Sequence, residues 1–398
     1  MTPSERLGEH LRVAGLFAGV GGIEVGLHKA GHVSSLLCEI DPGARRVLES
    51  RFPNARIESD VRLLKGLPRV DVLAAGFPCQ DLSQAGRTAG IAGTQSSLVE
   101  HIFRLVDSSP RAPRWLLIEN VSFMLQLDRG EAMRYLVEQL ESRRFAWAYR
   151  VVDTRAFGLP QRRQRVILIA SRTDDPRQVL FGEDHGAQVH KPIQKSQYGF
   201  YWTEGNRGLG WAVDELPTLK GGSTIGIPSP PAIWDPLGDT VTTPDIRDAE
   251  RLQGLDVDWT LAALEAEGVR RGHRWKLVGN AVSVPVAEWV GRRLASPLKS
   301  EPLSDKLLSR GVLWPRAAWG QRGKVFAVDM SMWPLKSRRP RLSKFLRFPR
   351  AQLSARAAAG FLSRARLSRL SFEDGFLDAV ERHVARVRSA EEVGRTVH

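Results

Sequence analysis

Short apolar segments alternate with amphipathic segments from residue 11 to residue 171. Runs of mainly Val, Leu, Ile and Ala are typical of buried strands, and they lie at 11–17, 33–40, 70–76, 114–120 and 166–171. Between them, apolar residues recur at helical spacing in 22–31, 43–52, 97–106 and 131–142. This alternation predicts an α/β fold with a mostly parallel sheet covered by helices. Ligands of such folds bind at the carboxyl ends of the strands.

The pattern changes twice along the chain. Residues 173–244 are rich in Gly, Pro and Trp and show no segment with the spacing of a normal helix, which predicts a small irregular domain. We therefore expect an α/β domain that consists of 1–172 and is completed by 245–298, where the earlier pattern resumes. Residues 299–398 follow as an extension. The spacing within 353–388 predicts two helices around a turn, so the extension is expected to be mainly helical.

Composition indicates a soluble, cytoplasmic protein with a polyanionic partner. The N-terminus lacks the apolar core of a signal peptide, and no apolar run reaches the roughly 18 residues that span a membrane. The net charge is +14, and residues 301–398 contribute +11 of it, with 20 Lys and Arg against 9 Asp and Glu. This excess favours nucleic acid as the partner. The two cysteines, Cys38 and Cys79, stand apart from any histidine cluster, so no metal site is expected.

The basic extension has two interpretations. Residues 336–350 interleave Lys and Arg with Phe, and 353–388 carries Arg on both of its expected helices. One interpretation is a module that contacts DNA phosphates, comparable to a helix-turn-helix. The other is a solvated basic face on helices that pack against the α/β domain. The charge excess favours phosphate contact.

The first expected strand leads into a glycine-rich turn, Phe17-Ala18-Gly19-Val20-Gly21-Gly22. Glycines at a strand-to-helix turn let the backbone approach a nucleotide-like ligand, although Glu24 occupies the last glycine position of the full dinucleotide fingerprint. Glu39 ends the second strand, where a carboxylate is suited to ribose hydroxyls. Asp60 and Asp71 are candidates for an adenine amino group. The absence of a lysine-bearing phosphate loop argues against ATP, and an adenosine with a sulfonium suits these acids and the Phe17 ring.

The reactive groups are expected at three neighbouring strand ends. Cys79 lies in the loop GFPCQ (76–80) directly after the third strand, where its thiolate can act as a nucleophile, although a free cysteine is more often an inert buried residue. Glu119 ends the next strand. Arg163 and Arg165 alternate along QRRQRV (161–166) and would point to one face of a strand. The three strand ends therefore offer a thiol, a carboxyl group and two guanidinium groups.

This set of groups matches methylation of cytosine at carbon 5. Addition of the Cys79 thiolate to carbon 6 makes the ring an enamine that accepts a methyl group from a sulfonium. Glu119 can supply a proton or hydrogen bond at ring nitrogen 3, and Arg165 can stabilise charge on the 2-keto oxygen. Loss of the proton from carbon 5 and expulsion of the thiol release the product. A base in a duplex must be flipped out for this reaction.

The chain resembles the DNA cytosine-5 methyltransferases. Six segments match the family's motifs in the family's order, over about residues 13–295, and they are LFAGVGG, GFPCQ, ENV, QRRQR, RDAERLQG and GNAVSVP. The resemblance implies a Rossmann-like fold that uses S-adenosylmethionine. It also implies that 173–244 is the target-recognition domain. Gly15 departs from the family, in which many members have an acidic or polar residue at this position.

The resemblance also implies roles for individual residues. For catalysis these are Cys79, Glu119, Arg163 and Arg165. For the cofactor they are Phe17 on the adenine, Glu39 on the ribose, Asp60 at the adenine amino group, and Gly19, Gly21, Gly22, Pro78, Leu98 and Asn280 around it. Gln80 and Ser83 would face the DNA backbone, and Thr218 or Thr240 would begin the short Thr-Leu/Val element of the recognition domain.

The expected function is methylation of cytosine in a specific short sequence of double-stranded DNA. The chain would act as a monomer. Family habit favours the modification enzyme of a restriction-modification system, with a restriction endonuclease as a genetic partner, and a solitary epigenetic role is equally compatible with the sequence. Two alternatives stay open. A related branch of the family methylates cytosine in tRNA, and a non-catalytic DNA-binding regulator can keep the fold. The long segment between QRRQR and RDAERLQG favours DNA, and intact Cys79, Glu119 and Arg165 argue against a regulator.

Overall fold

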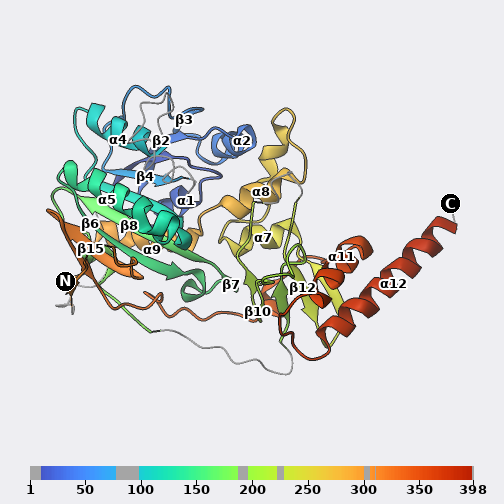
Figure 1. Ribbon diagram of the computed structural model, residues 1–398. Helices are drawn as coiled ribbons and strands as arrows, with labels where there is room; N and C mark the ends of the chain where they lie inside the picture. Colours follow the sequence, from blue (N-terminus) through green and yellow to red (C-terminus); the bar gives the residue numbers. More distant parts are fainter. Residues whose placement is uncertain are drawn as a thin grey trace, which may run out of the picture.

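A computed structural model describes residues 10–77, 98–186, 196–221, 228–299, 305–309 and 311–396. The chain forms two lobes, a larger one with a long mixed sheet and a smaller one that ends in two helices (Figure 1). Within the described residues, no helix has the length and apolar character needed to cross a membrane.

The large lobe is organised around a sheet of ten strands in the order β14-β16-β15-β6-β8-β5-β4-β1-β2-β3. The parallel strands are β1 (Arg12–Leu16), β2 (Val33–Cys38), β3 (Arg56–Glu58), β4 (Val72–Gly76) and β5 (Trp115–Val121). The antiparallel strands are β6 (Ala146–Asp153), β8 (Gln164–Ser171), β14 (Lys306–Leu307), β15 (Ala317–Gln321) and β16 (Lys324–Ala327). The expected parallel order therefore holds for β1–β5, and the other half of the sheet runs antiparallel.

Helices cover both faces of this sheet because each buries one apolar stripe on it. On one face lie α1 (Gly22–Lys29), α6 (Arg177–Leu180) and α9 (Val284–Ala295). On the other face lie α4 (Leu98–Ser108), η1 (Ser122–Leu125), η2 (Leu127–Gly130) and α5 (Glu131–Ser142). A separate apolar cluster joins β2 to α2 (Pro42–Arg51), η4 (Leu261–Glu265) and α8 (His273–Asn280). The result is a sheet covered by helices on both faces, as expected for an α/β fold.

The smaller lobe contains a five-stranded sheet, so the expectation of an irregular domain is wrong in this respect. Its strands, in spatial order, are β10 (Ala212–Val213), β9 (Tyr198–Phe200), β12 (Ala232–Asp235), β13 (Thr240–Thr243) and β17 (Ala351–Gln352). Helices α11 (Ala355–Arg366) and α12 (Phe376–Thr396) pack on it through a core that includes Phe200, Trp234, Phe361 and Phe376. The strands are too short for a period-2 pattern to stand out in the sequence.

The C-terminal extension also differs from expectation, because it belongs to both lobes. The two helices predicted within 353–388 are confirmed as α11 and α12, but β14–β16 continue the large sheet beyond β6. Pairing with β15 covers β6, whose eight residues would otherwise form a long exposed edge. The helices pack on the small sheet.

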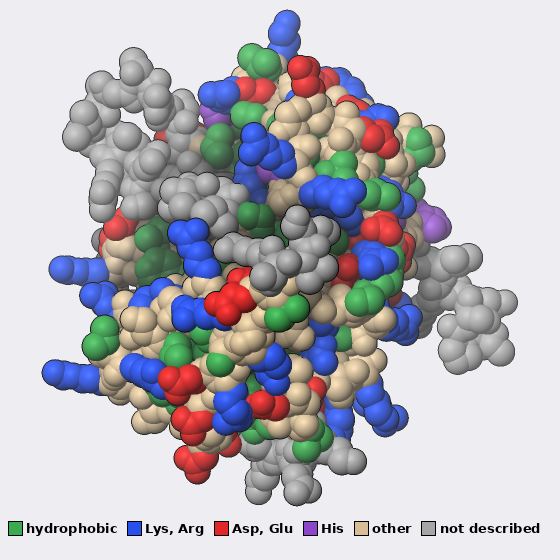
Figure 2. Space-filling view, turned by 90° about the vertical axis from the view of Figure 1, so that its right-hand side faces the viewer, with side chains coloured by type: hydrophobic (Ala, Val, Ile, Leu, Met, Phe, Trp, Pro, Cys, Tyr) green, Lys and Arg blue, Asp and Glu red, His purple; other side chains and the backbone are tan. Residues whose placement is uncertain are grey.

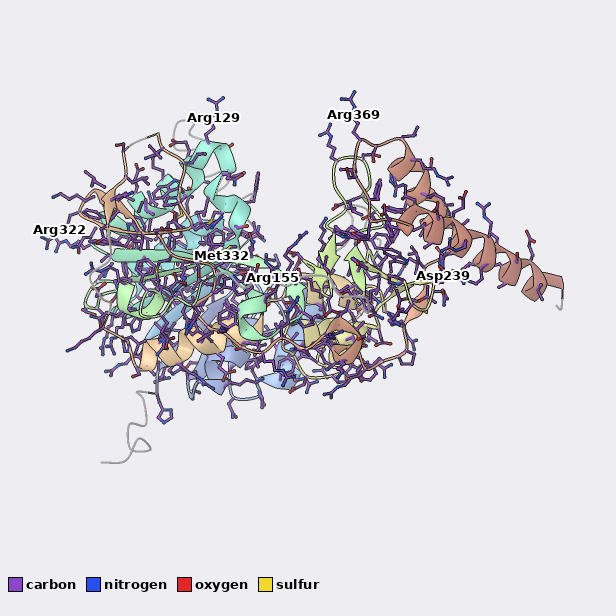
Figure 3. The ribbon with its side chains drawn as sticks, turned by 90° about the horizontal axis from the view of Figure 1, so that it is seen from below. Arg129, Arg155, Asp239, Arg322, Met332 and Arg369 are labelled. Atoms are coloured by element: carbon purple, nitrogen blue, oxygen red, sulfur yellow. The ribbon has the colours of Figure 1, made fainter. Side chains whose placement is uncertain are left out.

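A strap, defined as residues 336–350, connects the two parts of the extension (Figure 1). It includes the short helix α10 (Leu342–Phe345). Arg339 of the strap forms a buried ion pair with Glu215 of the small lobe, and Glu215 also pairs with Arg155 of η3 (Thr154–Phe157), at 3.3 Å. Arg155 lies where the lobes meet (Figure 3). The backbone amides of Arg347 and Phe348 donate to Asp248 in α7 (Ile246–Leu252).

Strands β7 (Gln161–Arg162) and β11 (Leu216–Pro217) form a two-stranded parallel sheet between the lobes. Leu216 and Leu219 of the small lobe pack there against Leu252 and Val278 of the large lobe. The two lobes therefore meet directly beside the segment that carries Arg163 and Arg165. We call this junction the seam.

Candidate active site

Three residues of the glycine-rich turn after β1 adopt left-handed backbone conformations, two of them glycines. Phe17, Gly19 and Gly21 all have positive φ, at 55°, 55° and 84°. A Cβ on Gly22 would lie 2.3 Å from the carbonyl oxygen of Val282, so no larger residue fits where α1 begins. The turn therefore packs closely against the segment GNAVSVP (279–285), as expected if both border one ligand site.

The acidic residue after β2 is fixed against this turn. Glu39 accepts a hydrogen bond from the Gly19 amide through Oε2 at 2.8 Å and one from the Asp41 amide through Oε1 at 2.8 Å. Phe17 is half-buried and meets the ring of Phe77 edge-on, with ring centroids 6.3 Å apart. Leu98 packs on the same apolar cluster as Phe17. The structure therefore brings Phe17, Glu39 and Leu98 to one end of the sheet.

The other two acidic candidates, Asp60 and Asp71, have partners of their own in the structure. Asp60 lies after β3, and its carboxylate forms a 2.6 Å ion pair with Arg62. Asp71 precedes β4 and accepts a hydrogen bond from the Arg12 amide at the start of β1. Asp71 therefore lies at the amino edge of the parallel strands, and its proposed contact with adenine is wrong. Asn280 ends α8 and is exposed, beside Gly221 of the small lobe.

Glu119 and Arg165 form an ion pair at the carboxyl end of β5. Their Oε1 and Nε atoms are 2.9 Å apart, and the side chains are only 10% and 12% exposed. Burial lowers the pKa of Arg165 and the charge of Glu119 opposes that shift, so the guanidinium remains charged. Glu119 lies directly across the ladder from Gly76, three residues before Cys79. The end of β4, the end of β5 and the beginning of β8 therefore lie together at this edge of the sheet.

Asn120 positions the beginning of the cysteine loop, a role that the sequence did not indicate. Its Nδ2 donates to the carbonyl oxygen of Phe77 at 2.9 Å, and its Oδ1 accepts from the Val121 amide. The side chain is buried. Four of the expected site residues, Pro78, Cys79, Gln80 and Ser83, lie outside the described residues.

Arg163 does not share the environment of Arg165. Its guanidinium is buried and donates to the carbonyl oxygens of Leu219, Gly279 and Ala281, at 3.1, 3.2 and 2.7 Å. These acceptors come from both lobes. These donors already bind backbone of both lobes, so Arg163 ties the lobes together at the seam.

The two candidate recognition threonines occupy different places. Thr218 donates to the carbonyl oxygen of Arg162 at 2.7 Å, and the Leu219 amide donates to Gln161, so this pair lies at the seam. Thr240 lies on β13 opposite Asp235, next to Asp239, which pairs with Arg382 of α12. Only Thr218 adjoins the segment that carries the arginines.

Glu24 explains the unusual Gly15. The Glu24 carboxyl group in α1 is 1% exposed, and a Cβ on Gly15 would lie 2.1 Å from its Oε1. Burial, with a smaller contribution from the charge of Glu39, raises the pKa of Glu24 to about 7. Glu24 of α1 therefore brings a carboxyl group next to Gly15, the β1 position that itself carries no side chain.

Glu24→Gln is expected to stabilise the protein at pH 8 and to have little effect near pH 4.5. The unfolded chain ionises Glu24 near pH 4.5 whereas the folded chain ionises it near pH 7, so the folded state loses stability as pH rises between these values. The gain at pH 8 is on the order of 3 kcal/mol. Urea unfolding at both pH values measures it, with Glu49→Gln on the exposed face of α2 as control. Equal gains at both pH values would contradict the pKa argument.

Comparisons with known proteins agree with this geometry. Residues 11–204 match the family model of the C-5 cytosine-specific DNA methylases. The chain is 48% identical over 382 residues to the type II methyltransferase M2.BsuMI of Bacillus subtilis strain 168, a match that covers 94% of this chain and 98% of the relative. It is 27% identical to the type II methyltransferase M.Bsp6I of Bacillus sp. strain RFL6, over 71% and 98% of the two chains.

A solved structure supports the fold. The Schizosaccharomyces pombe Dnmt2 methyltransferase superposes with a TM-score of 0.53 at 15% identity, over 72% of this chain and 98% of the other. At this identity the likeness concerns the fold alone.

Proposed function

Since the chain belongs to the C-5 cytosine-specific DNA methylases and is a type II methyltransferase that methylates carbon 5 of cytosine in DNA, we propose that Cys79, Glu119 and Arg165 carry out the transfer. The observation that carries this proposal is the buried Glu119–Arg165 ion pair, next to the strand that leads into Cys79. A carboxyl group and a guanidinium in this arrangement match the ring nitrogen 3 and the 2-keto oxygen of one cytosine.

S-Adenosylmethionine fits the carboxyl end of β1 and β2. Phe17 offers a half-buried aromatic face, Glu39 is fixed beside the turn, and Gly22 permits the close approach of backbone that a larger residue would block. In this proposal Phe17 stacks on the adenine, Glu39 holds the ribose, and Asp60 receives the adenine amino group. The turn glycines Gly19, Gly21 and Gly22, with Pro78, Leu98 and Asn280, complete the pocket. When bound, the cofactor supplies an electrophilic methyl group on a sulfonium.

The proposed residues divide the reaction among them. The Cys79 thiolate forms a bond to carbon 6 of the extruded cytosine while Glu119 supplies a proton or hydrogen bond at nitrogen 3. Arg165 stabilises the charge that develops on the 2-keto oxygen, and its ion pair keeps Glu119 oriented. After carbon 5 has gained the methyl group it loses its proton to a base. The electrons of that bond then expel the thiolate from carbon 6.

Glu119→Gln is expected to lower the single-turnover rate of methyl transfer by about 10²-fold or more. Glutamine keeps the shape and one acceptor oxygen, but it cannot transfer a proton and loses the ion pair with Arg165. Rapid-quench assays with labelled cofactor measure the rate. Glu100→Gln on α4 serves as a control, and a Glu119→Gln rate within about threefold of wild type would argue against proton supply.

We propose that the small lobe, with α11 and α12, forms the target-recognition domain, and that Thr218-Leu219 is its short element at the seam. Lys and Arg side chains recur on the face shown in Figure 2. Arg129 of the large lobe and Arg369 of the small lobe project on the same side of the molecule (Figure 3). Arg369 lies between α11 and α12 and is exposed. These cations support phosphate contact by the helical part of the extension.

Arg369→Ala is expected to weaken DNA binding and to reduce the salt slope by about 1, because one phosphate contact and its released counterion are lost. Fluorescence anisotropy of a labelled duplex across a salt series measures the slope. Arg322→Ala is the matched control, since Arg322 is also exposed but lies at the far end of the large lobe (Figure 3). Equal slopes for the two variants would place the phosphate contacts elsewhere.

Methylome sequencing tests the proposed function directly. Cells that express the chain are compared with cells that express Cys79→Ala, and both DNA and tRNA are sequenced for 5-methylcytosine. Methylation of DNA in one short recurring context, only with the wild type, supports the proposal and gives the target. The same context, resistant to a restriction endonuclease, would support the restriction-modification role. Methylation confined to tRNA would overturn the assignment to DNA.

A further inference from the structure

Tyr201 is a buried residue whose hydroxyl group lacks a partner. It follows β9 in the small lobe, and its side chain is 2% exposed. Among the residues that the structure describes, no atom forms a hydrogen bond with the phenolic oxygen. A buried hydroxyl without a partner costs about 1–3 kcal/mol, so its presence calls for an explanation.

The contacts of Tyr201 place it at the seam. The Lys220 ammonium lies over its ring, 3.9 Å from the ring centroid, and Lys220 also forms an ion pair with Glu204. Lys220 directly follows Leu219, whose carbonyl oxygen accepts from Nη1 of Arg163. The residue that covers the Tyr201 ring, Lys220, is therefore the direct neighbour in sequence of Leu219, which binds Arg163.

Electrostatics agree with this placement. Burial raises the pKa of Tyr201 well above its usual value, and the positive charges of Arg163 and Arg165 oppose the rise. The hydroxyl remains protonated at any physiological pH and is available as a hydrogen-bond donor.

A second donor at the seam also lacks an acceptor. Nε of Arg163 is buried and forms no hydrogen bond within the described part of the chain, although both of its Nη atoms donate to carbonyl oxygens. Within the described residues, the Tyr201 hydroxyl and the Arg163 Nε are thus two buried donors at the seam without an acceptor oxygen. A nucleotide carries such oxygens on its base and on its phosphates.

We propose that the Tyr201 hydroxyl donates a hydrogen bond to an acceptor oxygen of the extruded target nucleotide, next to the Glu119–Arg165 pair. This inference rests on the proposed function, in which the target cytosine is extruded. The acceptor is either the 2-keto oxygen of the base or a phosphate oxygen on its 3′ side. The small lobe would then supply a residue of the catalytic pocket itself, and docking of that lobe would be coupled to methyl transfer.

Tyr201→Phe in the full-length protein removes only the hydroxyl. On a duplex with one target site, its single-turnover rate, its Kd, or both are expected to worsen by about threefold to tenfold, the effect of losing one neutral hydrogen bond. Its melting temperature is expected to equal or exceed that of the wild type, because the lost group has no hydrogen-bond partner among the residues that the structure describes. Tyr198→Phe is the matched control, since Tyr198 lies on β9, three residues before Tyr201, and stacks on Trp211.

Two modified duplexes identify the acceptor. If the acceptor is the phosphate, a methylphosphonate 3′ to the target should remove the difference in Kd between wild type and Tyr201→Phe. If it is the base oxygen, an abasic target should remove that difference instead. A difference that survives both substitutions, a rate and Kd equal to wild type, or a lowered melting temperature would overturn the proposal. Absence of methylation by the wild type would instead reject the proposed function.

Discussion

Cys79→Ala is expected to abolish methyl transfer to DNA. Without the thiolate, carbon 6 has no nucleophile, so carbon 5 never gains the electron density that attacks a methyl sulfonium. The surrounding geometry should survive, because Asn120 fixes the backbone of Phe77 and Glu119 is held by Arg165. Transfer of labelled methyl groups to the target duplex under single-turnover conditions measures the loss.

Covalent trapping separates the role of the thiol from a folding defect. A duplex with fluorine on carbon 5 of the target cannot lose a proton there, so the wild type should remain attached through Cys79 after denaturation. Cys79→Ala should form no such adduct and should still bind S-adenosylmethionine within about twofold of the wild type. Cys38→Ala, which alters a buried thiol on β2, should form the adduct normally. An adduct with Cys79→Ala would assign the nucleophile elsewhere.

Truncation after residue 350 is expected to prevent folding of the small lobe. It removes β17, α11 and α12, and with them Phe361 and Phe376, whose ring centroids lie 5.1 and 5.0 Å from that of Phe200. Loss of one buried phenylalanine side chain alone costs about 3–5 kcal/mol. Since domains are stable by only about 5–15 kcal/mol, removal of this whole layer exceeds what the lobe can lose.

Near-ultraviolet circular dichroism and limited proteolysis measure this effect. The truncated chain should lose the signal of its packed tryptophans and be cleaved within 196–243. A chain that ends at residue 388 is the matched control, because residues 389–393 are exposed. A folded, protease-resistant small lobe in the shorter chain would show that α11 and α12 are accessory.

The sequence predicted best those site residues that lie at the ends of buried strands. Glu119 ends a buried run and Arg165 begins one, and both were expected at one edge of the sheet. They meet because β8 runs antiparallel to β5, a reversal that the expected parallel order did not include. The role of Gly15 did not follow, because it depends on Glu24, nine residues later, which reaches back under the turn. Sequence spacing does not reveal such a contact.

The small lobe shows why the rest escaped prediction. Strands of two to four residues, as in β9 and β12, carry too few positions for alternation to be recognised. Tyr201 was missed for the same reason. Formal charge was also misleading within the strap, where Arg339 is buried against Glu215 and is not displayed to DNA. The number of Lys and Arg residues sets the net charge of the chain, but it does not show which of them already form ion pairs.

The late position of β15 in the chain has a consequence for biosynthesis. Strand β6 ends at residue 153, but its neighbour β15 spans 317–321, so the ribosome must add more than 160 residues before the two can pair. At about 5–20 residues per second, β6 waits roughly ten to thirty seconds with an unprotected edge. The nascent chain is therefore most prone to misassociate before residues 317–321 emerge, and the sheet of the large lobe cannot be completed before then.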